Sequence, residues 1–445
     1  MKVFLVSLGC DKNLVDSEHI SGILTEAGYT FTDDETQADV IIINSCCFIN
    51  DAKEESINTI FEMAKYKKDK CKALVLAGCL AQRYHEEIED EIPEIDICVG
   101  TTAFDDIANA LEEFFKDKHK VVDLDDINCP AGFSAPRNIS TFGSYGYLKI
   151  AEGCDKHCTY CVIPKVRGDF RSVPIDNVLE EARRMVSLGV KELILIAQET
   201  TMYGADIYGK KSLHILVHEL SKIEGVKWIR ILYCYPEDIY PELIDEIKNN
   251  EKVCHYLDLP IQHASDRILK LMGRQTTKEE ISSKIKALRD AVPDIVLRTT
   301  LITGFPGESE EDHKEVLDFV EDTGFDRLGV FTYSQEEGTP AATMDGQIDE
   351  DLKVQRRNEI MELQQEIVFD KNDNLVGQEF EVLIEGKIPM ENAYIGRTYM
   401  DAPGVDSNIF VVTDEELMSG EFVKVSVTGA NDYDLIGDLT ERLED

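Results

Sequence analysis

Three cysteines, Cys154, Cys158 and Cys161, lie within the eight residues CDKHCTYC. This spacing lets one loop place three thiolates around a cubane iron–sulfur cluster and leave the fourth iron without a protein ligand. Such an open iron can bind a chelating molecule, as a catalytic zinc ion does through its vacant coordination position. The alternatives are accidental clustering and a zinc site, but zinc needs a fourth nearby Cys or His, and we expect His157 to point away. The spacing therefore predicts a 4Fe-4S cluster.

A second set of cysteines, Cys10, Cys46 and Cys79, is spread along the chain. Each immediately follows an apolar run, in VFLVSLGC, VIIINSC and LVLAGC. Parallel strands end at one edge of a sheet, where ligand sites form, so these three distant thiols are expected to converge on a second cluster. The alternative is that they are buried thiols acting as small apolar residues. Of the adjacent pair we favour Cys46 over Cys47, because neighbouring residues do not easily face the same cluster.

The first 117 residues alternate short apolar strands with helical segments, which predicts an open, doubly wound α/β domain. The expected strands are Lys2–Ser7, Val40–Asn44 and Ala73–Ala77. Residues 118–143 are expected to form a linker, since 128–144 are dense in Pro, Gly, Ser and Asn.

Residues 144–372 show six strand–helix units, which predict a partial (β/α)6 TIM-like barrel. The cysteine loop follows the first of these strands and so belongs at the mouth of the barrel, where active sites of this architecture lie. A helix over Glu350–Lys371 closes the unit. The expected strands are Gly146–Ala151, Glu192–Ala197, Trp228–Leu232, Tyr256–Leu259, Val296–Ile302 and Arg327–Phe331.

Residues 373–441 change to short alternating strands with Gly and Pro turns, which predict a small OB-like β-barrel. The expected strands are Glu379–Ile384, Ala393–Thr398, Ile409–Val412 and Glu421–Thr428. From residue 373 to the end there are four basic and seventeen acidic residues, a net charge of −13. A module that binds RNA phosphates needs cations, so direct RNA binding by this segment is not expected.

The whole chain of 445 residues carries a net charge of −41. This charge repels nucleic acid and favours a basic partner, although many acidic surfaces serve only solvation. No apolar stretch is long enough to span a membrane, and the first residues lack the features of a signal peptide. We therefore expect a cytoplasmic protein. In a reducing cytosol, cysteines more often bind metals or act as reactive thiols than form disulfides, so we expect the same of the twelve cysteines here.

The CxxxCxxC spacing resembles the signature of the radical S-adenosylmethionine superfamily. The resemblance implies that S-adenosylmethionine binds the open iron and is cleaved to methionine and a 5′-deoxyadenosyl radical. It further implies cofactor contacts from Tyr160 in the cysteine loop, from Gln198 and Glu199 after one strand, and from Gly304 and Pro306 after another. Glycines and prolines in such places also form ordinary turns.

Two cysteine triplets followed by a small β-module resemble the methylthiotransferase family over essentially the whole chain. The resemblance implies an amino-terminal methylthiotransferase domain, a radical S-adenosylmethionine core and a TRAM domain. It also implies two 4Fe-4S clusters, the second of which carries or supplies sulfur for a substrate carbon that has lost a hydrogen atom. A second S-adenosylmethionine then provides the methyl group. Residues 45–48, SCCF, depart from the family pattern, in which a small residue follows the ligand.

Residues 7–18, SLGCDKNLVDSE, resemble the branch of this family that modifies the β-carbon of an aspartate in small-subunit ribosomal protein number twelve. A basic ribosomal protein as substrate agrees with the acidic C-terminal segment. The alternatives are a transfer-RNA adenosine methylthiotransferase and, in another class, a two-cluster electron-transfer protein, which would need no substrate chamber. We also expect a reductant such as flavodoxin or ferredoxin, no membrane association, and a monomer.

Overall fold

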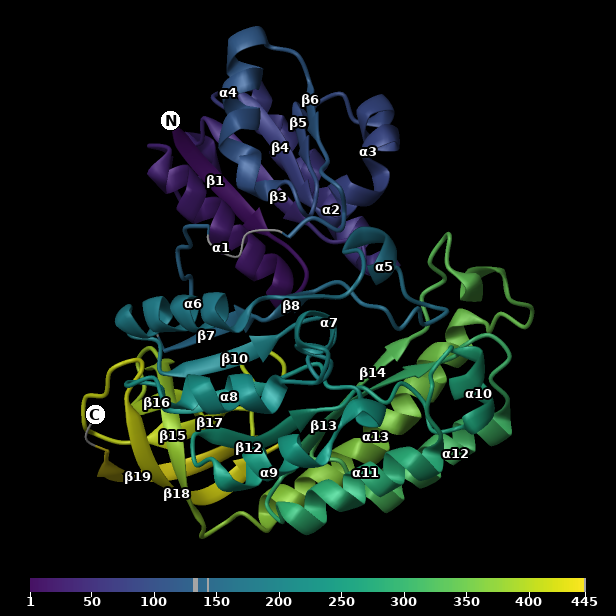
Figure 1. Ribbon diagram of the computed structural model, residues 1–445. Helices are drawn as coiled ribbons and strands as arrows, with labels where there is room; N and C mark the ends of the chain where they lie inside the picture. The colour runs from purple at the N-terminus through teal and green to yellow at the C-terminus, as the bar shows by residue number, and fades with distance from the viewer. Residues whose placement is uncertain (131–134, 142–143, 444–445) are drawn as a thin grey trace.

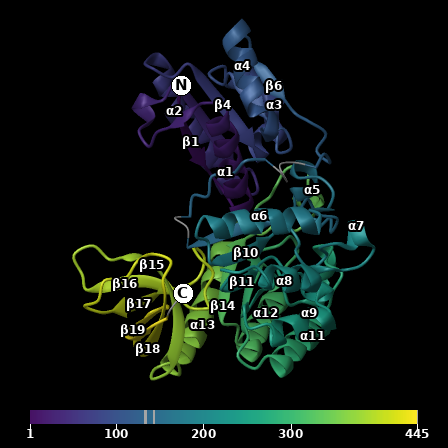
Figure 2. The ribbon, with the colours of Figure 1, turned by 60° about the vertical axis from the view of Figure 1, so that its left-hand side comes forward.

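The computed structural model describes residues 1–130, 135–141 and 144–443. Figure 1 shows an N-terminal parallel sheet, a second parallel sheet and a closed C-terminal barrel, and Figure 2 shows the same three bodies from another side. The predicted linker 118–143 includes residues 131–134 and 142–143, which lie outside the described residues. None of the described helices has the length and apolar content needed to cross a membrane.

The N-terminal sheet has six parallel strands in the order β2-β1-β3-β4-β5-β6. Its central strands, β3 and β4, are buried along their whole length. The reason is that α1 and α4 cover one face of the sheet, while α2 and α3 cover the other. The strands are β1 (Lys2–Ser7), β2 (Thr30–Phe31), β3 (Val40–Ser45), β4 (Ala73–Gly78), β5 (Ile97–Val99) and β6 (Val121–Asp123); the α-helices are α1 (Asp11–Glu26), α2 (Asn50–Ala64), α3 (Cys79–Glu91) and α4 (Ile107–Asp117). The predicted doubly wound arrangement is confirmed.

The second sheet contains six parallel strands in sequential order, β7-β10-β11-β12-β13-β14, which confirms the predicted partial barrel. Its strands are β7 (Tyr145–Lys149), β10 (Glu192–Ile196), β11 (Trp228–Ile231), β12 (Val253–Asp258), β13 (Val296–Thr303) and β14 (Arg327–Thr332). A separate pair, β8 (Ala151–Glu152) and β9 (Arg171–Ser172), flanks the cysteine loop. The α-helices are α5 (Ile163–Val166), α6 (Ile175–Ser187), α7 (Ala205–Tyr208), α8 (Leu213–Ser221), α9 (Pro241–Asn249), α10 (Asp266–Leu271), α11 (Lys278–Ala291), α12 (Glu310–Thr323) and α13 (Glu350–Asp373).

The C-terminal barrel closes in the order β15-β16-β17-β19-β18, with β17 and β19 parallel. Five closed strands confirm the predicted OB-like barrel. Its strands are β15 (Glu379–Lys387), β16 (Ala393–Arg397), β17 (Ile409–Val412), β18 (Phe422–Asn431) and β19 (Asp434–Arg442). The last strand was not predicted from the sequence.

The C-terminal barrel packs against the inner face of the second sheet, so that apolar side chains of both form one core. The rings of Trp228 and Phe422 meet edge to face with centroids 4.8 Å apart. At this interface Glu192 accepts hydrogen bonds from Arg230 Nε and from Arg397 Nη2, both at 2.7 Å. All three charged side chains are at most 1% exposed. This triad joins β10 and β11 to the C-terminal barrel.

Replacing Glu192 by Gln should lower the free energy of unfolding by about 3 to 5 kcal/mol, because both arginines lose a shared buried anion. The matched control is Glu441→Gln, which removes an ion pair with Lys424 whose side chains are about half exposed. That change should cost less than about 1 kcal/mol. Denaturant titration of each variant measures the difference, and equal costs would contradict the role of the triad.

Candidate functional site

The thiols of Cys10, Cys46 and Cys79 lie at the carboxyl ends of three neighbouring strands, β1, β3 and β4. The strand order reverses between β1 and β3, and such switch points are where open α/β sheets bind ligands. A Cβ atom added at Gly9 would lie only 2.9 Å from Cys46 Sγ, so the turn before Cys10 passes directly beside Cys46. Cys46 is within electrostatic range of both Cys79 and Cys10. The fold therefore brings together the three predicted residues.

Two of these thiols, Cys46 and Cys79, are buried. Burial raises the pKa of Cys46 to about 12 and also raises the pKa of Cys79, where the nearby Arg167 acts in the opposite direction. Both groups would be neutral at physiological pH, so metal binding would have to displace their protons. In the described residues, no three His, Cys, Asp or Glu side chains converge as ligands of a single ion. A cubane has several metal atoms, so its thiolates need not meet at one point.

Cys46 and Cys47 face different surroundings. Cys46 lies within electrostatic range of Cys10, Cys79 and Arg167. The Cys47 thiol donates a hydrogen bond to the carbonyl oxygen of Cys79 at 3.3 Å and packs within an apolar core. The charges that act most on Cys47 are those of Cys79 and Arg83. Cys46 is thus the member of the pair that lies directly beside the turn before Cys10.

The second triplet sits on a loop that begins directly after β8. Backbone hydrogen bonds anchor the loop at two points, from Cys154 N–H to Gly168 O at 3.1 Å and from Thr159 N–H to Met272 O at 2.9 Å. The Ile163 N–H points at Cys161 Sγ, 3.4 Å away. Burial and the neighbouring thiols Cys158 and Cys154 both raise the pKa of Cys161. Three thiols thus share one small volume, as the spacing predicts.

Several predicted cofactor contacts adjoin this loop. The Tyr160 ring lies edge-on to Phe305, with centroids 6.4 Å apart, and Phe305 contacts Tyr333 in turn. Gly304 and Pro306, on either side of Phe305, are buried. The structure therefore places Tyr160 beside the segment that follows β13, although the two are distant in sequence.

Glu308, which sequence reasoning missed, shapes this segment. Its Oε2 accepts the N–H groups of Gly304 at 2.7 Å and of Phe305 at 3.1 Å. The carboxylate is itself paired with Arg356 at 3.0 Å. A glutamate four residues after a glycine carries no distinctive sequence signal, because turn glycines and acidic residues are common.

Gln198 and Glu199 follow β10, at the same end of the partial barrel as the cysteine loop. Burial raises the pKa of Glu199 to about 8, although Lys156 of the cysteine loop, 3.8 Å away, opposes the shift. Among the described residues, Gln198 Oε1 and Thr303 Oγ1 are buried without a hydrogen-bond partner. Unsatisfied buried acceptors of this kind are costly unless a ligand or water completes them. The strand ends therefore fit a polar ligand carrying amine and hydroxyl donors.

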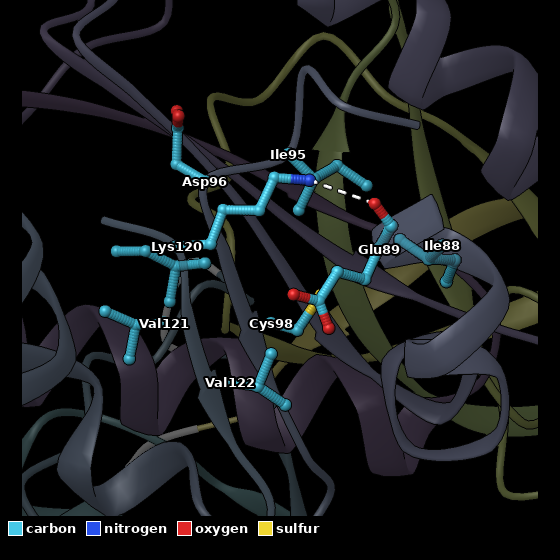
Figure 3. A pocket seen from close by; sticks show the side chains of 9 residues that line it. Ile88, Glu89, Ile95, Asp96, Cys98, Lys120, Val121 and Val122 are labelled. Carbon is cyan, nitrogen blue, oxygen red and sulfur yellow. Dashed lines mark hydrogen bonds between the residues drawn. The ribbon is translucent and has the colours of Figure 1, made fainter. Parts of the chain in front are cut away.

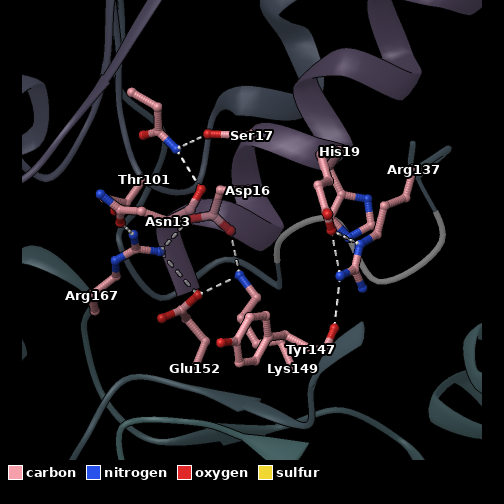
Figure 4. Close-up of polar contacts among 12 residues, drawn as sticks. Asn13, Asp16, Ser17, His19, Thr101, Arg137, Tyr147, Lys149, Glu152 and Arg167 are labelled. Atoms are coloured by element: carbon pink, nitrogen blue, oxygen red, sulfur yellow. Dashed lines mark hydrogen bonds and ion pairs between the residues drawn. The ribbon is translucent and has the colours of Figure 1, made fainter. Parts of the chain in front are cut away.

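A buried network joins α1 of the N-terminal domain to the partial barrel formed by the second sheet (Figure 4). Asp16 of α1 accepts hydrogen bonds from Lys149 Nζ at 2.6 Å and from Arg167 Nη1 at 2.7 Å. Glu152 accepts from the same two cations at 2.8 and 3.2 Å, and from Gln198 Nε2 at 2.5 Å. All four charged side chains are at least 94% buried. The network was not foreseen, because no pattern of sequence marks a charge as buried.

A cavity of about 50 Å³ lies where the three bodies meet. It is lined by Asp11, Tyr147, Leu232, Tyr233, Asp258, Arg298, Pro403 and Val405. A second hollow, beside β5 and β6 at one end of the N-terminal sheet, has about 10 Å³, which is room for about one water (Figure 3). Cys98 lines this smaller hollow, and none of the predicted site residues does.

Three family models match this chain, one for each of the three parts of the fold. Residues 2–100 match the model described as Uncharacterized protein family UPF0004, residues 148–320 match the Radical SAM superfamily, and residues 376–439 match the TRAM domain. Curated relatives include "Ribosomal protein uS12 methylthiotransferase RimO" of Lachnoclostridium phytofermentans, 57% identical over 98% of this chain and 99% of the relative. The protein of the same name from Clostridioides difficile is 51% identical over the full length of both chains.

Solved structures share the fold at low sequence identity. The radical S-adenosylmethionine methyltransferase TsrM from Kitasatospora setae, with cobalamin and a 4Fe-4S cluster bound, aligns with a TM-score of 0.56 at 13% identity, covering 76% of this chain and 73% of TsrM. The cobalamin-dependent S-adenosylmethionine radical enzyme OxsB aligns with a TM-score of 0.53 at 15% identity, covering 82% of this chain and 56% of OxsB. These likenesses concern the fold alone.

The cysteine loop should not tolerate a side chain at Gly153. This residue has a φ of +78°, and an added Cβ would lie 2.0 Å from the carbonyl oxygen of Asp169. Gly153→Ala should therefore lower the free energy of unfolding by about 3 kcal/mol, from backbone strain and overpacking together. Gly28→Ala is the control, because Gly28 has a φ of +85° but nothing within 4 Å of the added atom, and strain alone should cost about 1 kcal/mol. Denaturant titration tests this, and equal losses would show that the close approach is unimportant.

Proposed function

Because this chain belongs to the RimO family of ribosomal protein uS12 methylthiotransferases, we propose that it adds a methylthio group to the β-carbon of an aspartate in small-subunit ribosomal protein number twelve. The family and the radical S-adenosylmethionine class predicted from the sequence are confirmed. The observation that carries the proposal is the presence of two cysteine triplets, one at the carboxyl ends of β1, β3 and β4 and one on the loop that follows β8. The buried network links them, because Asp16 and Arg167 lie near Cys79 and Glu152 comes two residues before Cys154.

The protein supplies two sets of thiols and a set of polar side chains at the ends of β10 and β13. We assign Cys154, Cys158 and Cys161 to one 4Fe-4S cluster, and Cys10, Cys46 and Cys79 to the other. When bound, the clusters and S-adenosylmethionine would supply one-electron chemistry, sulfur and a methyl group. Soft thiols suit iron–sulfur binding, and three ligands per cluster would leave each cluster with one site free of protein ligands.

The ends of β10 and β13 would hold S-adenosylmethionine. Gln198 Oε1 and Thr303 Oγ1 would accept hydrogen bonds from its polar groups, which would satisfy both buried acceptors. Tyr160 would offer its ring to the adenine, beside the turn that contains Gly304 and Pro306. Glu199, buried near the cysteine loop, would face the amine of the amino-acid portion. In this arrangement the side chains bind and orient the cofactor and exclude water from it.

The charge of the C-terminal barrel favours a protein substrate over transfer RNA. All four of its basic residues have partners within the barrel or its interface. Arg397 pairs with Glu192, Lys424 with Glu441 and Arg442 with Glu421, while Lys387 lies over the Tyr394 ring. Against seventeen acidic residues, this leaves no set of free cations for phosphates in the described part of the barrel. A basic ribosomal protein would be attracted to such a surface.

The remaining partners follow from the same proposal. Ribosomal proteins are found in the cytoplasm, so the enzyme would act there. A one-electron donor such as flavodoxin or ferredoxin would reduce the clusters. We propose a monomer, because each set of thiols is complete within one chain.

Replacing Cys154, Cys158 and Cys161 together by Ala should abolish formation of 5′-deoxyadenosine, because the iron that binds S-adenosylmethionine would be lost. Replacing Cys10, Cys46 and Cys79 together should spare this cleavage but stop methylthiolation. Mass spectrometry of ribosomal protein and of transfer RNA after reaction identifies which gains the methylthio mass. Methylthiolated transfer RNA, or a wild-type protein that never cleaves S-adenosylmethionine, would contradict the proposal.

Single replacements should separate the two adjacent cysteines. Cys46→Ala should remove about half of the iron from the reconstituted protein, since one of two clusters would lose a ligand. Cys47→Ala, the matched control, should keep both clusters, because its thiol bonds to the Cys79 backbone. Iron and sulfide analysis after anaerobic reconstitution measures the difference. The opposite pattern would assign the ligand to Cys47.

A further inference from the structure

Lys12 is a buried lysine for which the described residues supply no ion-pair partner. Ten lysines and arginines are buried among the described residues, and nine of them form ion pairs. Lys12, only 6% exposed, forms no ion pair and no side-chain hydrogen bond within the described chain. Its ammonium group lies over the Tyr233 ring, 2.9 Å from the centroid. A cation with so little contact with water is costly unless it is paired, so this position favours an anionic ligand.

The carboxylates around Lys12 are already engaged. Asp11 accepts a hydrogen bond from the Tyr233 hydroxyl at 2.8 Å. Asp258 accepts from the Tyr233 N–H at 3.0 Å and pairs with Arg298 at 2.9 Å. Glu152 is held by Lys149, Arg167 and Gln198. Burial lowers the pKa of Lys12, whereas Cys10 and these carboxylates oppose that shift only as nearby charges, without a hydrogen bond to the ammonium group.

The position of Lys12 is well suited to an incoming anion. It lies in the first turn of the sixteen-residue helix α1, whose first residue is preceded by Cys10 without a side-chain cap. Unsatisfied N–H groups and the helix dipole favour negative charge at such an end. Tyr233, on which the ammonium rests, lines the 50 Å³ cavity between the three bodies. Lys12 does not itself line this cavity, but it contacts the Tyr233 ring that does, and it lies two residues from Cys10.

We propose that Lys12 binds the side-chain carboxylate of the substrate aspartate and thereby positions its β-carbon beside the Cys10, Cys46 and Cys79 site. This inference rests on the proposed function, since it assumes an aspartate substrate. The β-carbon is directly bonded to the carboxylate carbon, so fixing the carboxylate fixes the carbon that is modified. Lys12 is in this sense a substrate-binding residue that selects an acidic side chain.

The competing explanation is structural, in which Lys12 merely offsets the charge of thiolates at the adjacent site. The two explanations differ in what happens when the substrate loses its charge. A lysine that binds the substrate carboxylate distinguishes Asp from Asn in the substrate, whereas a lysine that only balances thiolates affects both substrates equally.

The test measures binding of intact ribosomal protein number twelve, with Asp or with Asn at the target position, to the anaerobically reconstituted full-length enzyme without reductant. Wild type should bind the Asp form about tenfold more tightly, as expected for a hydrogen-bonded charge pair. Lys12→Met should bring this ratio close to one by weakening the Asp form alone. Lys12→Arg should keep part of the preference. Lys286→Met, at an exposed lysine on α11, is the control and should leave the ratio unchanged.

Equal weakening of both forms by Lys12→Met, or a preference for Asp that survives it, would overturn the assignment. Retained affinity for the Asn form, together with unchanged iron content, shows that the variant is folded. Failure of the proposed function has a different signature, because wild type would then methylthiolate neither form of the ribosomal protein when reductant is added. A wild type that methylthiolates the Asp form but binds both forms equally would reject the role of Lys12 alone.

Discussion

The structure depends on balancing charges in a region from which water is excluded. Asp16 and Glu152 face Lys149 and Arg167 between the N-terminal sheet and the barrel, two anions against two cations. Such a network is stable only when every member is paired, because removing one leaves an uncompensated buried charge. It therefore fixes how α1, and with it Cys10, lies against the strand end that precedes the Cys154 loop. The spacing of the two thiol sites is a consequence of this match.

Much of the fold could be predicted because its signals are local. Buried parallel strands such as β3 and β4 appear as continuous apolar runs, and the eight-residue cysteine loop carries its own spacing. The elements that were missed have weak signals. Strands β2, β5 and β6, at or next to the edges of the N-terminal sheet, are only two or three residues long, and β19 places charged residues among its apolar ones. Short or acidic segments resemble loops until tertiary pairing selects a strand.

The candidate site was only partly predictable, because only some of its residues carry a local sequence signal. Cysteines and strand-end residues such as Gln198 could be placed from topology, since strand ends of a parallel sheet gather at one edge. Lys12, Glu152, Arg167 and Glu308 could not, because their roles arise from contacts between segments far apart in the chain. A charged residue in a sequence is normally assigned to the surface, and only packing shows otherwise.

The two thiol triplets also differ in how far apart their members lie along the chain. Cys154 and Cys161 span a single short loop, which costs little entropy to close and can form early during folding. Cys10 and Cys79 meet only after three strands and their crossover helices have assembled into a sheet. On the proposed assignment of the ligands, one iron–sulfur site would therefore be available on a nascent chain and the other only on a finished domain.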